Sequence, residues 1–529
     1  MSWSSATTCC SSRTSPPGAK RPTGGKPSRS TDTPHRTFLS VPLTHPRDPR
    51  AKRSADHDLR TAPRPGSPGT PAARPRPPGP HRGPHPRLVP DHAPQSSRHR
   101  PDGDPMTTAS RRARRLAFLE SNLTGTGMRA LRHAVDMGLS PVFVTSDPAR
   151  YDAEPETARA IRETSEQILV CDTQDPETIA KTLLTALGPG GSSQDAGLCG
   201  VMTVMEYYVP TAAAVAHRLG LPGIAPDAAA RARDKLRTRT ACAEHGVAVP
   251  GFRFVRSTDE IDSLLEEIPL PCVVKPIDES ASIGVRICHT IEQLAQGITE
   301  IAQSPVNSKG QPRIPGALAE ECVFGHEVSV ETFTFAGRTT VLGVTDKLLG
   351  TTPHFVELGH TFPSTVPHAQ QAADLALAAL DAIGFDFGPA HTEVKLTPRG
   401  PVLIEINART GGDFIPDLVE QALGIPLLEQ SIVAHSGGTP DLTPTRSEGA
   451  AIRFLAGRDG VVAQAPDLTV MANFPSVVSY HSKAQPGRTT RYPHNSHERL
   501  GHVLTRAATA SLAAAEADAA LCHLAPTYR

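Results

Sequence analysis

From Leu116 onward, short apolar runs alternate with amphipathic stretches, and this pattern indicates where the first folded part of the chain begins. Apolar runs such as LAFLES and PVFVTSD predict buried strands. The segments GMRALRHAVDMG and PETIAKTLLTALG predict helices, the first closed by Gly138 and the second with Pro176 in its first turn. Strands that alternate with helices indicate a parallel sheet, so we expect an N-terminal α/β domain over residues 106–226.

The pattern changes after Asp234. Strand-like runs such as PGFRFV and CVVKPI flank a helical segment, and long β-rich runs such as EVSVETFTFAG follow them. Two further runs, AHTEVKL and PVLIEIN, are separated by TPRG and predict an antiparallel hairpin. We therefore expect an α+β domain over residues 227–440 and a small C-terminal α+β domain over residues 441–529.

The first 105 residues follow neither the helical nor the strand period. They contain 18 basic residues, 7 acidic residues and 22 prolines, and the first glutamate of the chain is Glu120. Such a segment buries too little apolar surface to offset the entropy of ordering, so we expect residues 1–105 to be a disordered extension. It has almost no aromatic residues that could stack on bases, and no nucleic-acid partner is expected. Met106 is a candidate for the true start.

Charge and cysteine content narrow the class of protein. The whole chain has 54 basic and 54 acidic residues, so the basic extension is balanced by an acidic remainder. No run approaches the roughly 18 apolar residues that span a bilayer, which excludes a membrane-embedded protein. The nine cysteines form no C-x-x-C pair and their number is odd, which fits thiols in a reducing cytoplasm better than a zinc site or a disulfide framework.

The loop TGTGMRA after the first strand has three interpretations. It could bind a dinucleotide, with Asp147 as the acid at the ribose, although Ala130 replaces the third glycine of that motif. It could hold a phosphate or a small substrate at the N-terminus of the helix. Its glycines could also serve only the turn between strand and helix.

The hairpin brings oxygen ligands together. With a turn at residues 397–400, Glu393 falls opposite residues 404 and 405, and Glu405, Asn407 and Arg409 share one strand face because side chains alternate. Two carboxylates and an amide oxygen suit Mg²⁺ that also holds substrate phosphates. The alternative is a solvated polar face, but this triplet lies in an apolar run, where unpaired charges are costly to bury.

Two lysines and a small-residue turn precede the hairpin. Lys275 lies in the apolar run PCVVKPI and needs an anionic partner. Lys235 begins a helix after Asp234, and by itself it would be read as a surface residue. The following turn, PIDESASIGV, could cover phosphates with its backbone N–H groups.

Together these residues resemble the ATP-grasp superfamily, and its carboxylate–amine (L-amino acid) ligases in particular, over residues 116–520. The DK and VVKP segments are similar to the family's two phosphate lysines, and SASIGV is similar to its loop that covers the phosphates. EECVFGHEVSVE resembles its adenine hinge and TEVKLTPRGPVLIEINART its metal hairpin. The resemblance implies an α/β and α+β fold in which two α+β subdomains enclose ATP.

The resemblance also implies a role for each residue of these motifs. Arg409 and Lys275 would be catalytic, and Mg²⁺ or Mn²⁺ would be bound by Glu393, Glu405 and Asn407. The nucleotide would be bound by Lys235, Lys275, Ser280, Ser282, Gly284, Glu320, the backbone of Glu321, Cys322 and Val323, and, at the ribose, Glu327.

The activity implied by the resemblance is an ATP-dependent ligation. A small-molecule carboxylate would be phosphorylated to an acyl phosphate and then captured by an amine, with release of ADP and phosphate. An amino acid is the expected partner on at least one side, and a homodimer is one expected assembly. A biotin-carboxylase type of reaction with bicarbonate is a second interpretation, but TGGDFIPDLV follows Arg409 where biotin carboxylases carry a Val-Glu-His run. A nucleotide-binding protein without catalysis is the third.

Six further residues are weaker candidates. Three histidines could face the site but are more often surface or satisfied polar residues, and Glu206 could bind an amino substrate or cap a helix. Asp413 and Asp417 could simply begin the helix IPDLVEQALG. The histidines are His326, His354 and His360.

Overall fold

The computed structural model describes residues 114–529 apart from residues 124, 189–190 and 351–355. The predicted disorder of residues 1–105, the start at Met106, the first two cysteines and His354 lie outside the described residues. Among the helices that are described, none is long and apolar enough to cross a membrane.

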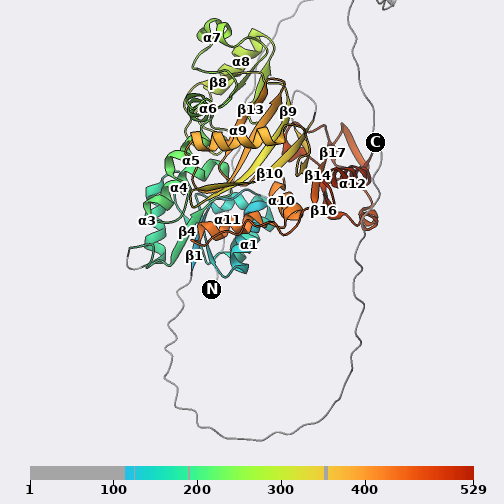
Figure 1. Ribbon diagram of the computed structural model, residues 1–529. Coiled ribbons are helices and arrows are strands. Elements are labelled where there is room, and N and C mark those ends of the chain that lie inside the picture. Colours follow the sequence, from blue (N-terminus) through green and yellow to red (C-terminus); the bar gives the residue numbers. More distant parts are fainter. Residues whose placement is uncertain (1–113, 124, 189–190, 351–355) are drawn as a thin grey trace, which may run out of the picture. The chain divides into compact units, whose positions relative to one another are not determined.

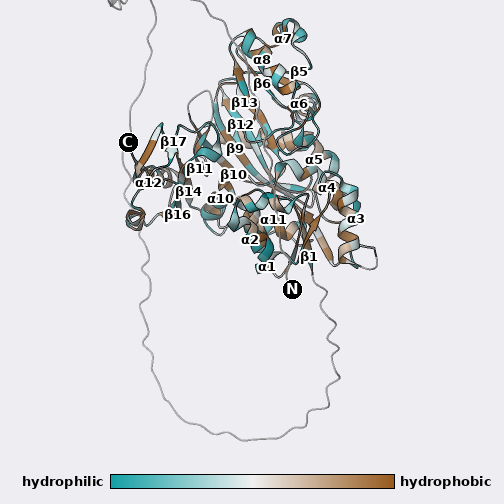
Figure 2. Cartoon of the chain, turned by 180° about the vertical axis from the view of Figure 1, so that it is seen from behind, coloured by the Kyte–Doolittle hydropathy of each residue, from teal (hydrophilic) through white to brown (hydrophobic). Residues whose placement is uncertain are grey.

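The N-terminal part is the predicted parallel α/β unit (Figure 1). Its four parallel strands have the order β3-β2-β1-β4 and are β1 (Arg115–Leu119), β2 (Ser140–Thr145), β3 (Gln167–Val170) and β4 (Leu198–Met202). The helices are α1 (Thr126–Asp136), α2 (Pro155–Thr164), α3 (Pro176–Leu187) and α4 (Val209–Arg218). Asp175 caps α3 by accepting hydrogen bonds from the second and third residues of the helix, and Gly138 has a positive φ of 75° just after α1. These helices carry both hydrophobic and hydrophilic residues (Figure 2), as amphipathic helices on a sheet do.

A small antiparallel sheet forms the next part and carries Lys275 at the end of one strand. Its strands have the order β5-β8-β6-β7 and are β5 (Phe252–Val255), β6 (Cys272–Lys275), β7 (Arg286–Cys288) and β8 (Ala317–Glu321). The helices of this region are α5 (Pro226–Arg233), α6 (Lys235–Glu244), α7 (Ile261–Glu267) and α8 (Ile291–Ala302). Leu264 and Leu294 are fully buried and pack α7 and α8 against the apolar residues of this sheet.

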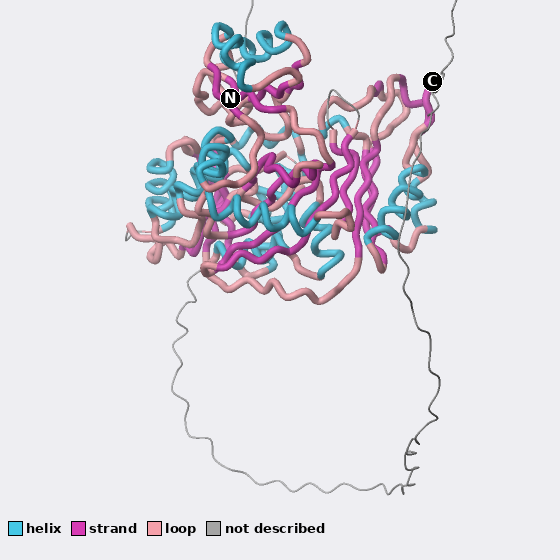
Figure 3. Tube along the Cα trace, turned by 45° about the horizontal axis from the view of Figure 1, so that its top comes forward, coloured by secondary structure: helices cyan, strands magenta, loops and turns pink. Residues whose placement is uncertain are grey.

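The largest sheet of the described residues has eight strands, each antiparallel to its neighbours (strands are magenta in Figure 3). Their order is β13-β12-β9-β10-β11-β14-β18-β16. They are β9 (His326–Phe335), β10 (Arg338–Leu349), β11 (Glu357–Phe362), β12 (Gly388–Thr397), β13 (Gly400–Asn407), β14 (Gly449–Leu455), β16 (Val477–Ser482) and β18 (Gly501–Ala507). Helix α9 (Ala369–Ala382) packs its alanines on the apolar face that carries Val328, Val330 and Val394. The opposite face of β9 and β12 is thereby left for polar side chains.

The C-terminal segment continues this sheet. Strands β14, β18 and β16 extend it beyond β11, so the part expected as a small separate domain shares its sheet with the part expected as the ATP-grasp domain. Helices α10 (Ile415–Leu423), α11 (Leu427–His435) and α12 (Ala510–His523) pack around it, and α11 also contacts β4 and α1. A three-stranded sheet is formed by β17 (Thr489–Thr490), β15 (Gly460–Gln464) and β19 (Thr527–Tyr528). Short 3₁₀ helices are η1 (Pro148–Ala153), η2 (Glu206–Tyr208), η3 (Thr258–Glu260), η4 (Leu468–Asn473) and η5 (Ser496–Glu498).

Candidate functional site

One face of the large sheet collects the acidic residues of the predicted metal hairpin. His391 is the register partner of Asn407, and Glu393 is the register partner of Glu405. A β-bulge next to Glu393 shifts the register by one residue, which places Glu393 opposite residue 405 rather than residue 404. His391 also faces Glu331 on β9, so three neighbouring strands present polar side chains to the same side. The predicted convergence of the two strand faces is confirmed.

Each carboxylate of the hairpin is held by a cationic group. The Lys235 Nζ lies 2.8 Å from Glu405 Oε1, and the Lys347 Nζ lies 2.7 Å from Glu393 Oε1. Lys347 also lies 2.9 Å from Glu327 and 2.9 Å from Glu357, so one buried ammonium serves three carboxylates. Burial alone would raise the pKa of Glu393, but the charges of Lys347 and His391 hold it well below its ordinary value. Glu393 is therefore ionised.

A buried histidine supports the same carboxylates. His391 Nδ1 lies 3.0 Å from Glu331 Oε2, and its Nε2 lies 3.4 Å from Glu393 Oε1. Burial alone would lower the pKa of His391, but the two carboxylates raise it to about 10. The imidazolium thus bridges Glu331 and Glu393 and fixes the side chain of Glu393 on the polar face.

The residues of this face fit a hard divalent cation. Glu393 and Glu405 offer carboxylate oxygens on paired strands, and Asn407, two residues beyond Glu405 on the same face, offers an amide oxygen and is 4% exposed. Oxygen ligands of this kind suit Mg²⁺ or Mn²⁺, whereas sulfur and imidazole ligands would favour softer metals. Lys235 and Lys347 balance the charge of these two carboxylates.

The second predicted lysine lies in a buried charge network. Lys275 Nζ lies 2.6 Å from Glu320 Oε2, and Arg239 Nε lies 2.9 Å from Glu320 Oε1. Burial, with help from the positive charges of Arg239 and Lys235, lowers the pKa of Lys275, and Glu320 opposes that shift. The resemblance implied that Glu320 meets the adenine. The structure places its carboxylate between Lys275 and Arg239, where it orients the lysine.

The segment expected as the adenine hinge joins β8 to β9. The carbonyl oxygen of Val323 accepts a hydrogen bond of 3.2 Å from Lys395, and Glu321 is ion-paired with Arg399 at the hairpin turn. Cys322 between them is half-buried. Glu327, expected at the ribose, contacts Lys347 and lies 3.8 Å from Lys395, and its role at the ribose stays a prediction. Lys395 thus ties the hinge to the hairpin.

The expected covering loop connects β6 to β7 and exposes its tip. Ala281, Ser282 and Gly284 have φ values of 56°, 58° and 75°. The backbone N–H of Ser280 donates a hydrogen bond of 3.2 Å to the hydroxyl of Tyr207 in η2. The loop is therefore attached to the N-terminal unit at its beginning, while residues 281–284 are exposed to solvent.

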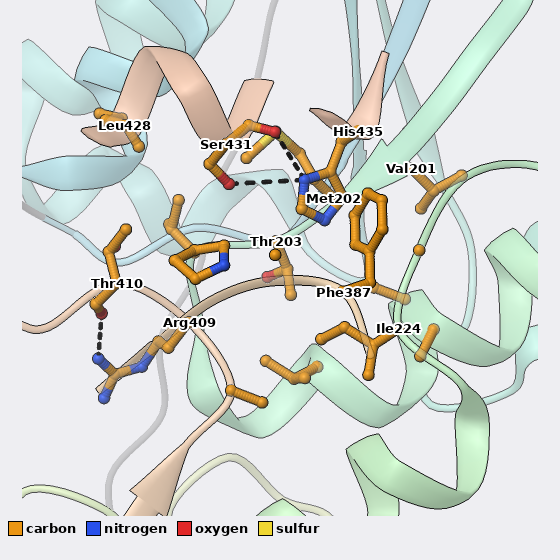
Figure 4. A pocket seen from close by; sticks show the side chains of 18 residues that line it. Val201, Met202, Thr203, Ile224, Phe387, Arg409, Thr410, Leu428, Ser431 and His435 are labelled. Atoms are coloured by element: carbon orange, nitrogen blue, oxygen red, sulfur yellow. Dashed lines mark hydrogen bonds between the residues drawn. The ribbon is translucent and has the colours of Figure 1, made fainter. Parts of the chain in front are cut away.

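Arg409 connects the hairpin strand to the N-terminal unit. Its Nε lies 2.7 Å from Glu206 Oε2, and its Nη1 donates a hydrogen bond of 2.7 Å to the carbonyl of Thr410. Glu206 is 5% exposed, so this weaker candidate is neither solvated nor a helix cap with its side chain. A cavity of about 30 Å³ lies behind Arg409, and Figure 4 shows the guanidinium directed away from it toward Thr410. A cavity of this size holds about two water molecules and no amino acid.

A second polar cluster lies on β11 and the segment after Arg409. His360 is buried, with Nε2 3.8 Å from Asp413 Oδ2, and Asp413 accepts hydrogen bonds of 2.6 and 2.7 Å from Arg499. Asp413 therefore pairs with Arg499 rather than beginning α10, whereas Asp417 lies in the first turn of that helix and binds Arg129. Neither ring nitrogen of His360 has a hydrogen-bond partner.

The remaining candidates divide between packing and surface roles. His326 is exposed and lies 3.2 Å from Asp346. The second glycine of the TGTGMRA loop packs closely, because a Cβ on Gly127 would lie 1.8 Å from the hydroxyl oxygen of Ser121. Packing of the turn explains that glycine without a dinucleotide. The sequence did not single out Lys347, although a lysine in the strand run VLGVTDKLLG needs an anionic partner, as Lys275 does.

Three regions of the chain match models of protein families. Residues 268–417 match the ATP-grasp domain and residues 131–223 match the ATP-grasp N-terminal domain. The chain belongs to the ATP-grasp superfamily. Residues 453–529 match the L-amino acid ligase C-terminal domain 2, which places this ATP-grasp chain among the carboxylate–amine ligases. The predicted family and fold class are confirmed.

Relatives of this ATP-grasp ligase differ in how much of it they share. The uncharacterized protein y4rH of Sinorhizobium fredii is 28% identical over 430 residues, which cover 80% of this chain and 86% of that protein. The alanine–anticapsin ligase of Bacillus subtilis is 28% identical over 254 residues, 44% of this chain and 53% of the ligase. The chain thus spans about half the length of that relative. The crystal structure of L-amino acid ligase from Bacillus licheniformis has a TM-score of 0.63 at 21% identity, covers 79% of this chain and 100% of that chain, and shows a shared fold.

Proposed function

We propose that the protein is an ATP-dependent ligase that joins a small-molecule carboxylate to an amine through an acyl phosphate and releases ADP and phosphate. The observation that carries this proposal is the face on which Glu393, Glu405 and Asn407 meet, next to the cations Lys235 and Arg409. Negative groups for a divalent cation and positive groups for phosphates are what phosphoryl transfer from ATP requires.

The first step transfers the γ-phosphoryl group of ATP. An oxygen of the substrate carboxylate attacks the γ-phosphorus, the bond to the bridging oxygen breaks, and ADP leaves. Mg²⁺ held by Glu393, Glu405 and Asn407 would supply charge neutralisation on the phosphate oxygens. Lys235 and Lys275 bind the phosphates as point charges, and Arg409 orients and stabilises the group in transfer. The carboxylates of the hairpin hold charge and do not act as acid or base.

The second step forms the amide. The nitrogen of the amine attacks the acyl carbon, phosphate leaves, and the nitrogen loses a proton. Water competes for the same carbon, so the loop at residues 276–285 has to cover the site while the acyl phosphate exists.

We propose an amino acid on at least one side of the reaction. The match to the L-amino acid ligase C-terminal domain and the likeness to the alanine–anticapsin ligase support this choice. Glu206, which contacts Arg409, and Glu357, which contacts Lys347, are acidic groups that could pair with a substrate ammonium group. The cytoplasmic location and the homodimer stay predictions.

The experiment is phosphate release from ATP with Mg²⁺, screened over pairs of amino acids with mass detection of the product. We expect phosphate release that requires both a carboxylate and an amine. The product should have the summed mass of the two substrates less one water. Release that depends on bicarbonate would support the carboxylase instead. Tight ATP binding without any turnover on the pairs would overturn the proposed activity.

A further inference from the structure

The covering loop begins with a buried glutamate that the reaction steps do not use. Glu279 is 5% exposed, and its Oε2 accepts hydrogen bonds of 2.8 Å from the Tyr207 hydroxyl and 2.9 Å from the Ser308 hydroxyl. Its Oε1 accepts a hydrogen bond of 2.8 Å from the Ser308 backbone N–H and is ion-paired with Arg313. Burial alone would raise the pKa of Glu279, but these partners hold it below its ordinary value.

The three side chains come from three separate parts of the chain. Tyr207 belongs to η2 of the N-terminal unit, directly after Glu206. Glu279 precedes the loop tip, and Ser308 lies between α8 and β8. The Tyr207 hydroxyl donates to Glu279 and accepts a hydrogen bond from the backbone N–H of Ser280. The Ser308 hydroxyl lies 2.9 Å from both the Tyr207 hydroxyl and Glu279 Oε2 and shares its single proton between them. We call Tyr207, Glu279 and Ser308 the loop anchor.

The loop anchor is continuous with the phosphate-binding charges. The backbone carbonyl of Glu279 accepts a hydrogen bond of 2.6 Å from Lys235, whose ammonium also lies 2.8 Å from Glu405. The Arg233 guanidinium stacks 4.5 Å above the Tyr207 ring. The side chain of Glu279 is thus fixed by the N-terminal unit while its backbone fixes Lys235.

The backbone after the loop anchor is strained. Ala281 and Ser282 are consecutive non-glycine residues in the left-handed region, at φ 56° and 58°. Such conformations are unfavourable for residues with a side chain and persist where the surrounding structure holds them. Residues 281–284 are exposed, and the loop is held before them by Asp278, which binds Arg313, and by Glu279 and Ser280. Within the turn, the backbone N–H of Ile283 donates a hydrogen bond of 3.2 Å to the carbonyl of Ser280.

We propose that Tyr207 is a positioning residue that holds the covering loop closed through the loop anchor and thereby protects the acyl phosphate from water. This inference rests on the proposed ligase reaction. When the hydroxyl is missing, the loop opens more often, and water attacks the acyl group to regenerate the carboxylate and phosphate. ATP is then consumed without amide formation.

The test is Tyr207→Phe, which removes the hydroxyl and keeps the ring under Arg233. We expect the ratio of phosphate released to amide formed to rise about tenfold, as expected for the loss of a hydrogen bond to a charged group. Tyr208→Phe is the matched control, because its hydroxyl faces Thr173 and Arg150 rather than the covering loop. It should keep the wild-type ratio. Ser308→Ala should raise the ratio in the same direction as Tyr207→Phe.

A second measurement does not need the substrates. Hydrogen–deuterium exchange of residues 276–285 should be faster in Tyr207→Phe than in Tyr208→Phe, with and without Mg–ATP. Unchanged exchange, or an unchanged ratio in an active enzyme, overturns the inference. If the wild-type protein forms no amide from any pair but Tyr207→Phe still speeds exchange in the loop, the proposed reaction fails and the loop anchor stands.

Discussion

Glu393 on β12 lies directly opposite Glu405 on β13, so two carboxylates share one face of the hairpin as register partners. Like charges directly opposite one another destabilise a sheet. The structure compensates each one from outside the hairpin: Lys347 on β10 lies 2.7 Å from Glu393, and Lys235 at the start of α6 lies 2.8 Å from Glu405. Two lysines from outside the hairpin thus offset the repulsion between the paired carboxylates.

The first prediction concerns this pair. Glu405→Gln keeps the size of the side chain but removes a charged oxygen ligand and the partner of Lys235. We expect a loss of at least ~2.7 kcal/mol of transition-state stabilisation, roughly a hundredfold in rate. The measurement is ADP formation with saturating substrates, with Glu267→Gln at an exposed position of α7 as control. Near-normal ADP formation in Glu405→Gln would contradict the metal assignment.

The second prediction separates binding from chemistry at Arg409. Arg409→Ala removes the guanidinium that lies 2.7 Å from Glu206. We expect ATP affinity, measured by calorimetry with Mg²⁺, to stay within about threefold of wild type while phosphoryl transfer stops. Glu206→Gln retains the guanidinium but weakens its orientation, so it should lose rate by only about tenfold, ~1.4 kcal/mol. An Arg409→Ala protein that no longer binds ATP would show that the arginine has a different role.

The hairpin could be predicted from the sequence because its determinants are local. The turn fixes the register and the period of two fixes the faces, so Glu393, Glu405 and Asn407 could be brought together without knowledge of the rest. Only the bulge beside Glu393 was needed to decide between residues 404 and 405. The strands and helices of the N-terminal unit were predictable for the same reason, since each apolar run specifies its own element.

The partners of these residues depend on how distant segments pack. Lys347 reaches Glu393 only because β10 and β12 both pair with β9, and Glu206 reaches Arg409 from a unit two hundred residues earlier in the chain. The large sheet continues into the C-terminal segment because β14 pairs with β11. The sequence pattern of neither strand indicates which strand will lie beside it. Contacts of this kind have no local signal beyond the general rule that a buried charge requires a partner.

The third prediction tests the ammonium at the centre of the acidic face. Lys347→Met leaves Glu327, Glu357 and Glu393 without a common counter-charge, and breaking such a buried network costs ~3–5 kcal/mol. We expect the free energy of unfolding in urea to fall by about that amount, whereas Lys181→Met on the exposed side of α3 changes it little. Added MgCl₂ should stabilise Lys347→Met more than wild type, because the cation partly replaces the lost charge. If Lys347→Met and wild type were equally stable, these three carboxylates would not need Lys347 as their counter-charge.

The fourth prediction concerns pH and the C-terminal strands. His502 on β18 packs 4.4 Å from the ring of Phe414, and burial, with the charges of His481, Arg499 and Lys483, lowers its pKa to about 4, while Asp413 opposes the shift. In the unfolded chain the imidazole of His502 has its ordinary pKa of about 6.5. Between pH 6.5 and 4, His502 therefore binds a proton in the unfolded chain but not in the folded protein. Folding stability contributed by His502 is therefore present above pH 6.5 and is lost as the pH falls to 4, by on the order of 3 kcal/mol.

The comparison that checks this sign is urea unfolding at pH 7, 5.5 and 4 for wild type and His502→Phe. The phenylalanine keeps an aromatic ring against Phe414 and cannot be protonated, so the decline between pH 7 and 4 should be shallower in His502→Phe. His217→Gln, on the exposed side of α4, should follow the wild-type decline.

Because His502 and Phe414 join β18 to the segment that follows Arg409, loss of this contact in acid should also release that segment. Ligase activity should then fall over the same pH range in wild type more steeply than in His502→Phe, and parallel pH profiles would show that the contact does not support the site.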